Sequence, residues 1–298
     1  MKLLVITQKV DKQASDLGFF HSWLLEFYRQ VGQFTVICLQ KGENTLPFDI
    51  KVLSLGKESG RSKIKYIKNF YKYIWQERKN YDVVFVHMNE EYVLLGGLLW
   101  KLLGKPVGLW RNHSKGTFFT RLAVYLSDMV FCTSLESYTS RFKKTKVMPT
   151  GINTEKFVLA KEPERLSRSV LSIGRISPVK NIDVFIKALL LLDKEEFNFT
   201  ANIVGDADED SEEYYKNLLF MTEPLIKKGK VVFKPAVSNT KTPEVYYSHE
   251  LFVNMTISGS LDKTIFSAMY CRDLVLMCNT FLKDILPDEF KKSVAHQN

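Results

Sequence analysis

The strongest candidate for ligand chemistry is a short basic loop between a predicted buried strand and a predicted helix. The stretch VLSIGRISPVKNIDVFIKAL ends its apolar run at Gly174 and Arg175, passes through Pro178, and reaches Lys180 and Asn181 before an amphipathic helix. A junction of this kind brings backbone N–H groups and the positive end of a helix dipole to one point, which favours an anion. Arg175 and Lys180 add two permanent charges, so the segment predicts phosphate binding, with plain surface charge as the alternative. The pattern of a Walker loop is absent.

A second candidate segment runs from Thr256 to Asn279 and reads TISGSLDKTIFSAMYCRDLVLMCN. Small residues, an Asp-Lys pair, helical apolar spacing and a short apolar strand follow one another. This order is typical of a loop that meets a phosphorylated or hydroxyl-rich ligand at a helix N-terminus. The residues predicted to lie at that ligand are Ser258, Gly259, Ser260, Leu261, Asp262 and Lys263. Ser267 stands on the helix itself, where a sugar-binding protein would be expected to carry an acid.

The composition is that of a folded chain in a reducing compartment. Contents of 45% hydrophobic and 25% charged residues are typical of soluble globular proteins. The apolar start MKLLVITQKV is too short for a signal peptide, and Lys101 and Lys105 interrupt the longest apolar stretch. The four cysteines show no CxxC spacing and are expected to be buried free thiols. We therefore expect a cytoplasmic chain without a membrane span. The acidic turn Asp206–Asp210 is interpreted as solvated, and no metal site is expected.

Much of the net charge of +9 is concentrated in the stretch GRSKIKYIKNFYKYIWQERKN. Its lysines alternate with Ile, Tyr, Phe and Trp at helical spacing. One interpretation is a helix that packs on the core and exposes a basic face. The other is a helix that leans on an anionic membrane surface, which would place the chain at the inner face of a membrane. Nucleic acid is not expected as a partner, because no nucleic-acid-binding motif accompanies the charge.

Short apolar strands alternate with helical patterns along the whole chain, which predicts the α/β class with parallel sheets. The predicted helices include Gly18–Gln30, Lys63–Arg78, Ile182–Leu192 and Glu212–Lys227. The predicted strands are Leu3–Thr7, Phe34–Leu39, Val83–Val86, Val107–Trp110, Met129–Cys132, Lys146–Met148, Val170–Ile173, Phe199–Val204, Val231–Phe233, Leu251–Val253 and Leu274–Met277. The polar stretch Pro149–Ser169 holds no strand-length apolar run. We place the boundary there and predict two doubly wound domains, 1–150 and 151–298, with the ligand in the cleft between them.

Several of these segments resemble retaining glycosyltransferases of family four, which have the GT-B fold. SIGRISPVKNIDVFIKAL resembles the start of that family's second domain, and GINTEKF resembles the linker motif that precedes it. LFVNMTISGSLDKTIFSAM resembles the donor-facing segment, and RLAVYLSDMVFCTSLES resembles a segment of the first domain. The resemblance covers nearly the whole chain in order. It implies two Rossmann-like domains, with an acceptor on the side of the first and a nucleotide-sugar donor in the second.

The resemblance also assigns roles to single residues. Gly174, Arg175 and Lys180 match the positions that hold the donor's diphosphate. Gly18 matches a glycine-bearing loop near the phosphates and the acceptor, although the double glycine of many members is absent. His113, in LWRNHSKG, matches a histidine that faces the transferred sugar, with a loop-stabilising histidine as the alternative. Asn89 follows a strand and is a candidate acceptor contact, although a helix cap explains its neighbours equally well. No metal or other cofactor is expected, because Arg and Lys neutralise the diphosphate.

The sequence departs from the family in two places. The family carries two glutamates eight positions apart, and their places fall at Gly259 and Ser267. The second glutamate accepts hydrogen bonds from the donor ribose. Its loss would weaken donor binding by about ten- to a hundredfold. After Leu274–Met277 the family's chain normally continues further, so the second domain is expected to be incomplete.

The leading hypothesis is a retaining glycosyltransferase that moves a sugar from a nucleotide-diphosphate sugar to a glycan or lipid-linked acceptor, in cell-surface glycan synthesis. A transferase-like protein that binds a nucleotide or a partner without turnover is the alternative from a different class. A nucleotide-sugar 2-epimerase shares the fold, but the Gly-Arg…Lys and Ser-Gly-Ser-Leu-Asp-Lys segments fit transferases better.

Overall fold

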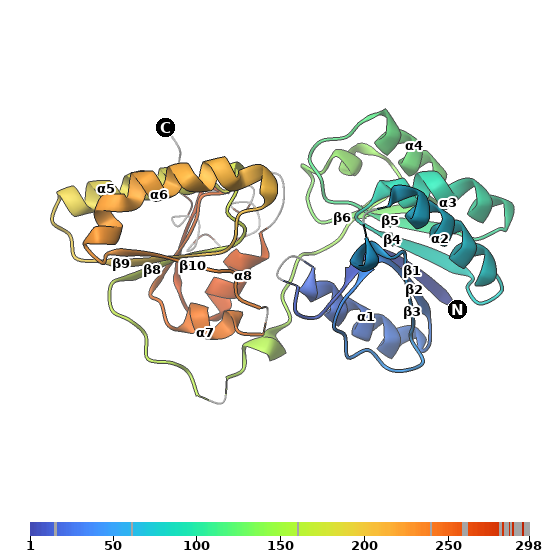
Figure 1. Cartoon of the computed structure of the whole chain (residues 1–298), viewed down its shortest axis with the longest axis horizontal. Helices are drawn as coiled ribbons and strands as arrows, with labels where there is room; N and C mark the ends of the chain where they lie inside the picture. The colour runs from blue at the N-terminus through green and yellow to red at the C-terminus, as the bar shows by residue number, and fades with distance from the viewer. Residues whose placement is uncertain are drawn as a thin grey trace. The chain divides into compact units, whose positions relative to one another are not determined.

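The computed structural model describes residues 1–14, 17–60, 62–159, 161–238, 240–257 and 262–279, and the single residues Leu282, Leu286, Asp288 and Val294. The chain forms two compact units, Met1–Pro149 and Thr150–Asn298. Each unit is built on a parallel sheet with helices between most consecutive strands (Figure 1).

The first unit contains a seven-stranded sheet in the order β3-β2-β1-β4-β5-β6-β7. Its strands are β1 (Leu3–Val10), β2 (Thr35–Lys41), β3 (Lys51–Ser54), β4 (Val83–His87), β5 (Val107–Trp110), β6 (Met129–Cys132) and β7 (Thr145–Val147). Its helices are α1 (Gly18–Val31), α2 (Lys63–Gln76), α3 (Glu90–Leu102) and α4 (Phe118–Leu126), with 3-10 turns η1 (Lys57–Ser59) and η2 (Tyr138–Arg141). The strand order reverses between β1 and β4, which is where doubly wound folds bind ligands.

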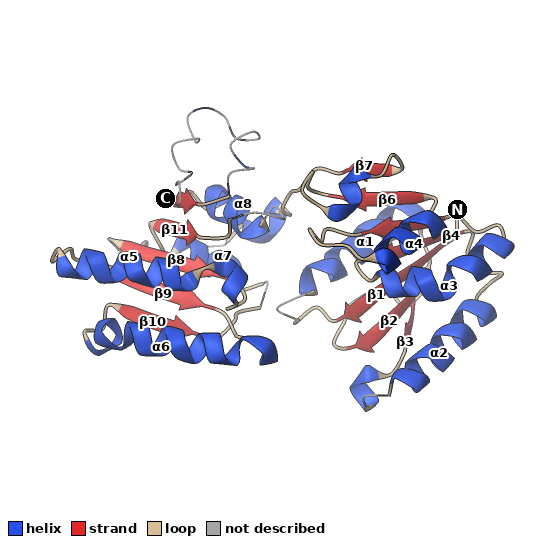
Figure 2. Cartoon of the chain, turned by 90° about the horizontal axis from the view of Figure 1, so that it is seen from above, coloured by secondary structure: helices blue, strands red, loops and turns tan. Residues whose placement is uncertain are grey.

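The side chains of β1 point alternately to the two faces of the sheet, so the core of this unit has two layers. Leu3 and Val5 pack with the buried side chains of α1, whereas Leu4 and Ile6 pack with those of α2, α3 and α4. Successive residues of a strand point to opposite faces of a sheet, so an uninterrupted apolar strand must be covered on both sides. The helices α2, α3 and α4 therefore form one layer on the face opposite α1 (Figure 2).

The second unit contains a five-stranded sheet in the order β10-β9-β8-β11-β12. Its strands are β8 (Ser169–Ile173), β9 (Thr200–Val204), β10 (Val231–Lys234), β11 (Leu251–Asn254) and β12 (Leu274–Met277). Its helices are α5 (Ile182–Lys194), α6 (Glu212–Lys227), α7 (Thr242–Tyr247) and α8 (Lys263–Tyr270), with 3-10 turns η3 (Thr154–Phe157), η4 (Pro178–Lys180) and η5 (Glu209–Ser211). The strand order reverses between β8 and β11. Val170 of β8 packs toward α5 and α6, and Leu171 packs toward α7 and α8.

The predicted α/β class and the two doubly wound parallel sheets are confirmed, and each predicted strand is present. The strand β3 was not predicted. It is a four-residue edge strand with no buried residue, so its sequence carries neither an apolar run nor a clear alternation.

All four cysteines are buried free thiols. Within the described ranges, no three His, Cys, Asp or Glu side chains are placed together as metal ligands. No helix among the described residues combines the length and apolar character needed to cross a membrane.

Asp273, between α8 and β12, has a carboxyl group that is fully buried. In the described part of the chain neither carboxyl oxygen has a hydrogen-bond partner, and Nη1 of Arg165 lies 3.5 Å from Oδ1. Burial raises the pKa of Asp273 to about 8, although the charge of Arg165 acts to lower it. The folded state therefore favours the protonated acid at neutral pH.

The raised pKa of Asp273 predicts a pH-dependent stability. An unfolded aspartate has a pKa of about 3.9, so the folded chain holds the proton more tightly between about pH 4 and pH 8. The free energy of unfolding contributed by this group must fall as the pH rises through that window. Asp273→Asn removes the ionisation, so its advantage over the wild type in free energy of unfolding should grow by roughly 4 kcal/mol between pH 5 and pH 8.5. Urea unfolding followed by circular dichroism measures this, and equal pH slopes for both proteins would contradict it.

Candidate functional site

The loop after β8 is held in one conformation by backbone bonds. Gly174 has a φ of 145°, and its N–H donates to the carbonyl of Val204 at 3.0 Å. The N–H of Ile176 donates to the carbonyl of Asp206 at 2.9 Å. Asn181 has a φ of 47° and donates from its side chain to the carbonyl of Met255 at 3.0 Å. The loop is therefore fixed against the ends of both β9 and β11, at the point where the strand order reverses.

Lys180 and Asp262 form the central ion pair of this region. They come from the loop after β8 and from the N-cap of α8, and Oδ2 of Asp262 accepts from Nζ of Lys180. Asn254 donates to the same oxygen at 3.0 Å, and the hydroxyl of Thr264 donates to Oδ1 at 2.8 Å. Burial by itself raises the pKa of Asp262, but Lys180, Asn254 and Thr264 outweigh it and hold the pKa below its usual range. The carboxylate is therefore charged and fully engaged.

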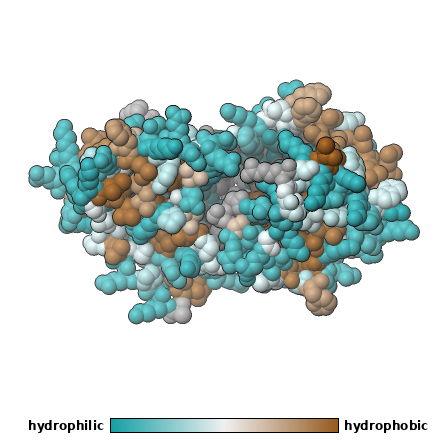
Figure 3. Space-filling model, viewed as in Figure 1, coloured by the Kyte–Doolittle hydropathy of each residue, from teal (hydrophilic) through white to brown (hydrophobic). Residues whose placement is uncertain are grey.

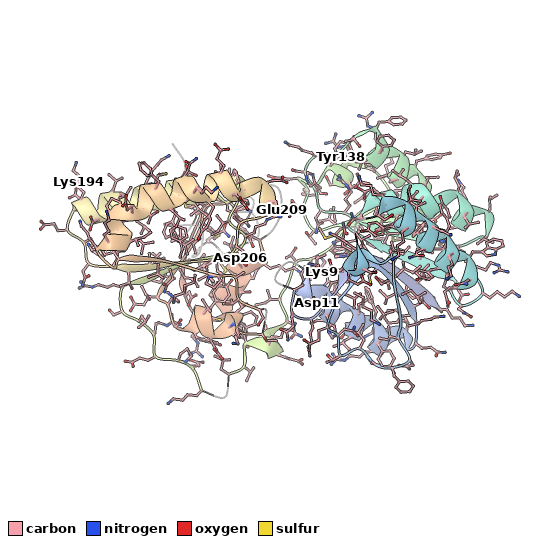
Figure 4. All side chains as sticks on the ribbon, viewed as in Figure 1. Lys9, Asp11, Tyr138, Lys194, Asp206 and Glu209 are labelled. Carbon is pink, nitrogen blue, oxygen red and sulfur yellow. The ribbon has the colours of Figure 1, made fainter. Side chains whose placement is uncertain are left out.

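Arg175 is the more exposed cation of the loop. Its guanidinium lies 3.4 Å from Oδ2 of Asp208, and the two side chains are 66% and 42% exposed. An exposed pair of this kind contributes little to stability, so its guanidinium can turn to another anion at small cost. Asp208 lies in the acidic turn predicted to be solvated, and Asp206 of that turn accepts from the N–H of Ala236 at 3.0 Å. The turn therefore supports the loop, because the Asp206 carbonyl also accepts from the N–H of Ile176 (Figure 4 labels Asp206 and Glu209 within the turn).

A hollow of about 280 Å³, open to solvent, lies beside these residues. Its wall includes Gly174, Arg175 and Lys180 from the loop, and Asn254 and Thr256 from the end of β11. Thr256 is 4% exposed, and its hydroxyl has no hydrogen-bond partner among the described residues. A buried hydroxyl without a partner is costly, and a bound polar ligand would satisfy it.

A larger hollow of about 960 Å³, also open to solvent, lies at the ends of β9 and β10. Gly205, Asp206, Tyr215 and Phe233 contribute to its wall. The rings of Tyr215 and Phe233 meet edge to face with centroids 5.7 Å apart. This hollow therefore presents aromatic surface next to the basic loop.

The helix α8 carries the other predicted residues of the second unit. Asp262 caps it by accepting from the N–H of Thr264 at 3.2 Å, and Lys263 is its first residue. Ser267 is buried and donates to the carbonyl of Lys263 at 3.1 Å. Its hydroxyl is thus used inside its own helix. Four further predicted residues, Ser258, Gly259, Ser260 and Leu261, lie outside the described residues.

In the first unit, two predicted residues lie after the strands that flank the reversal of strand order, and a third lies after the neighbouring strand β5. Gly18 begins α1 and follows β1, Asn89 is the N-cap of α3 and follows β4, and His113 follows β5. His113 is exposed, and its Nδ1 lies 3.0 Å from the N–H of Lys115, which donates to it. Asn89 makes no side-chain cap hydrogen bond. The loops that carry these residues therefore share one edge of the sheet.

The loop of His113 is held by a largely buried ion pair that the sequence did not reveal. Nε of Arg111 donates to Oε2 of Glu90, and the Thr120 hydroxyl donates to Oε1 of Glu90 at 2.7 Å. Nη1 and Nη2 of Arg111 donate to the carbonyls of His113 at 3.3 Å and Lys115 at 3.0 Å. Burial alone raises the pKa of Glu90, but Arg111 and Thr120 hold it below its usual range. Arg111 therefore fixes the backbone on both sides of the loop's tip.

The chain is similar to known proteins in part of its sequence and in its fold. Residues 167–294 match the family model Glycosyl transferases group 1. HepE of Anabaena, solved in complex with UDP and glucose, is similar with a TM-score of 0.72 and 17% identity over 96% of this chain and 83% of that one. Sucrose-phosphate synthase of Thermosynechococcus elongatus gives a TM-score of 0.70 with 13% identity over 97% and 84% of the two chains. The catalytic domain of starch synthase IV of Arabidopsis thaliana, bound to ADP and acarbose, gives 0.71 with 12% identity over 97% and 85%. No curated protein sequence shows significant similarity to the chain.

These likenesses establish the fold. Both units are parallel-sheet α/β units of the GT-B type, with the smaller sheet in the second. The match to the glycosyltransferase family covers the segment that contains Gly174, Arg175, Lys180, Asp262 and Ser267.

The first prediction from this geometry concerns Gly205. A Cβ at this position would lie 1.9 Å from the carbonyl oxygen of Gly174, so Gly205→Ala must push the basic loop away. We expect the free energy of unfolding to fall by about 2–4 kcal/mol, from overpacking plus backbone strain. Gly229→Ala is the matched control, because Gly229 also has a positive φ but open space around it, and should cost about 1 kcal/mol. Equal losses in urea unfolding would show that the close approach has no role.

The second prediction concerns Glu90. Glu90→Gln leaves Arg111 without its carboxylate and should lower the free energy of unfolding by about 3 kcal/mol. Glu91→Gln, at an exposed position of the same helix turn, should change it by less than about 0.5 kcal/mol. All four tryptophans precede residue 111, so tryptophan fluorescence follows the first unit selectively. A loss no larger in Glu90→Gln than in Glu91→Gln would contradict the anchoring role.

Proposed function

We propose that the protein is a retaining glycosyltransferase that uses a nucleotide-diphosphate sugar as donor. The observation that carries this proposal is the fixed basic loop from Gly174 to Asn181. It lies at the reversal of strand order, inside the segment that matches Glycosyl transferases group 1. The structures of HepE with UDP and glucose and of starch synthase IV with ADP support a nucleotide as the ligand of this fold.

The diphosphate of the donor is proposed to bind between the loop and the N-termini of α5 and α8. Arg175 offers a planar set of N–H donors once it leaves the exposed carboxylate of Asp208. The Lys180 ammonium has three donors, so pairing with Asp262 leaves others for a phosphate oxygen. Thr256, in the wall of the same hollow, offers a hydroxyl that has no hydrogen-bond partner in the described part of the chain. The nucleoside is proposed to lie in the adjacent larger hollow, against Tyr215 or Phe233.

The proposed chemistry follows from where charge develops. The bond between the anomeric carbon and the diphosphate oxygen breaks, and a bond from that carbon to the acceptor hydroxyl oxygen forms on the same face. The acceptor's proton moves to the departing phosphate oxygen. Negative charge grows on the leaving diphosphate, so cations already fixed beside it lower the barrier. We assign that role to Arg175 and Lys180 without a metal ion.

The acceptor is proposed to be a glycan or a lipid-linked glycan, bound by loops of the first unit. Gly18, Asn89 and His113 follow strands at the ligand-binding edge of its sheet. WaaG, a glycosyltransferase of lipopolysaccharide biosynthesis, has a similar structure with a TM-score of 0.64, which supports a role in making a cell-surface glycan. The anchoring of His113 by Arg111 suits a residue that must face the transferred sugar.

A nucleotide-binding protein without turnover is the second candidate, and Ser267 favours it. The family's glutamate at this position accepts hydrogen bonds from the donor ribose, whereas the Ser267 hydroxyl donates to Lys263 within α8. A serine hydroxyl that already donates its proton to Lys263 is a weaker hydrogen-bond acceptor for the ribose hydroxyls than a carboxylate is. Donor binding would then rest mainly on the diphosphate contacts.

The two candidates are separated by binding and turnover measured on the same protein. Isothermal titration with UDP, GDP and ADP should show binding of at least one nucleotide, weakened about ten- to a hundredfold in Arg175→Ala. Lys187→Ala, which removes an exposed lysine on α5, is the matched control and should bind as the wild type does. Release of nucleotide from the matching sugar donors then reports turnover. If no nucleotide bound, or if both variants bound equally, the donor site would be misplaced.

Ser267→Glu provides the second arm of that experiment. Tighter nucleotide binding, with the melting temperature unchanged within a few degrees, would identify this position as the ribose contact. Turnover by the wild type identifies a working transferase. Binding without turnover in the wild type, with turnover gained in the variant, identifies the nucleotide-binding alternative.

A further inference from the structure

The helix α2 has an apolar stripe that is exposed to solvent and does not pack in the core. Its inward side chains, Phe70 and Ile74, are fully buried. The residues Ile64, Ile67, Tyr71 and Trp75 are 82%, 43%, 42% and 51% exposed. Their spacing of three and four residues places them along one side of the helix, next to the buried side that Phe70 and Ile74 form. The basic helix therefore packs on the core and still presents a second apolar stripe to solvent.

The stripe continues across the neighbouring helices. The Tyr71 hydroxyl donates to the carbonyl of Leu95 at 2.9 Å, which joins α2 to α3. On α3, Leu98 and Leu102 are 65% and 86% exposed, one turn apart. On α4, Phe118, Leu122 and Tyr125 are 73%, 38% and 69% exposed and also share one side. Nζ of Lys101 lies 5.5 Å from the Tyr125 ring centroid, which joins α3 to α4.

We call this surface of α2, α3 and α4 the outer helical face. Apolar side chains gather on the side of the molecule where α3 and α4 lie (Figure 3). Single exposed apolar residues are ordinary, but a contiguous apolar surface on three helices marks an interaction site.

The charge on the outer helical face has one sign. Lys63, Lys65, Lys68 and Lys72 on α2 are all exposed, as is Lys101 on α3. The sequence has no acidic residue from 59 to 76 or from 92 to 127. Of the acids at the helix ends, Glu77 pairs with Lys51 at 2.5 Å, Glu90 pairs with Arg111, and Glu91 is exposed in the first turn of α3. Glu58, just before this range, interacts with Lys65. The face therefore combines apolar surface with an excess of positive charge.

We propose that the outer helical face binds the surface of an anionic lipid bilayer. Lysines are depleted in protein–protein interfaces, because burying an ammonium group there is costly. At a bilayer the same lysines extend to the phosphate groups while their stems and the apolar stripe lie lower. Tryptophan and tyrosine, here Trp75, Tyr71 and Tyr125, favour the interface between water and hydrocarbon. This inference is independent of transferase activity and concerns a surface apart from the donor site.

The test is sedimentation of the full chain with vesicles of two compositions. Binding is expected with phosphatidylglycerol in phosphatidylcholine at a ratio of about 3 to 7, but not with phosphatidylcholine alone, and 0.5 M NaCl should weaken it. Lys68→Gln with Lys72→Gln should weaken binding about twenty- to thirtyfold, at roughly fivefold for each charge. Lys187→Gln with Lys194→Gln on α5 changes the net charge equally and should leave binding unchanged.

Substitutions of Trp75 test the role of the apolar stripe in vesicle binding. Trp75→Ala should weaken vesicle binding at least tenfold, whereas Phe220→Ala, at a 79% exposed position of α6, should not. In the wild type, vesicles should shift tryptophan emission to shorter wavelength, and Trp75→Phe should remove that shift while binding persists. Melting temperatures of the variants exclude unfolding as the cause of a loss.

Three results would overturn the proposal. They are a lack of binding to anionic vesicles, an equal loss in the α5 control pair, and a fluorescence shift that persists in Trp75→Phe. A different result would assign the outer helical face to a second copy of the chain. In that case the wild type would not bind vesicles but would self-associate as its concentration rises, and Trp75→Ala would abolish the self-association.

Discussion

The ion pair between Lys180 and Asp262 is the interaction on which the organisation of the second unit depends. It links residues 82 positions apart, one in the loop after β8 and one at the cap of α8. Asp262 also accepts from Asn254, so the end of β11 belongs to the same network. Removing either charge would leave the other partly buried and unpaired, which costs several kcal/mol. The pair therefore fixes the geometry of two helix N-termini at the reversal of strand order, and this geometry suits an anion.

The first unit uses the same principle with different residues. Glu90 lies at the start of α3 and Arg111 lies after β5, and their pair fixes the loop that carries His113. In both units a carboxylate at a helix start holds a cation that shapes a loop at the ligand-binding edge of the sheet. Each of these carboxylates keeps a lowered pKa despite burial, so both pairs remain charged at neutral pH. The layer α2–α4, on the face of the sheet opposite α1, carries the surface proposed to meet lipid.

The sequence predicted the sheets well because their strands are buried on both faces and therefore appear as uninterrupted apolar runs. It missed β3, which is short, at the edge and partly exposed. It predicted Arg175, Lys180 and Asp262 as site residues, but it did not pair Lys180 with Asp262, since nothing in residue spacing shows a contact across 82 positions. It also left open which side of α2 faces the core. Both interpretations of that helix depended on one apolar pattern. Only the solvent exposure of Ile64, Tyr71 and Trp75 distinguishes an exposed apolar stripe from the buried one.

The loop from Gly174 to Asn181 and the start of α8 are proposed to hold a nucleoside diphosphate. Hydrogen exchange of backbone amides, with and without a saturating nucleoside diphosphate, tests this most directly because it locates the ligand without requiring turnover. We expect slower exchange at residues 174–181 and 262–265, and unchanged exchange in β5 and β6. Protection confined to other segments, with none in the loop after β8, would contradict it.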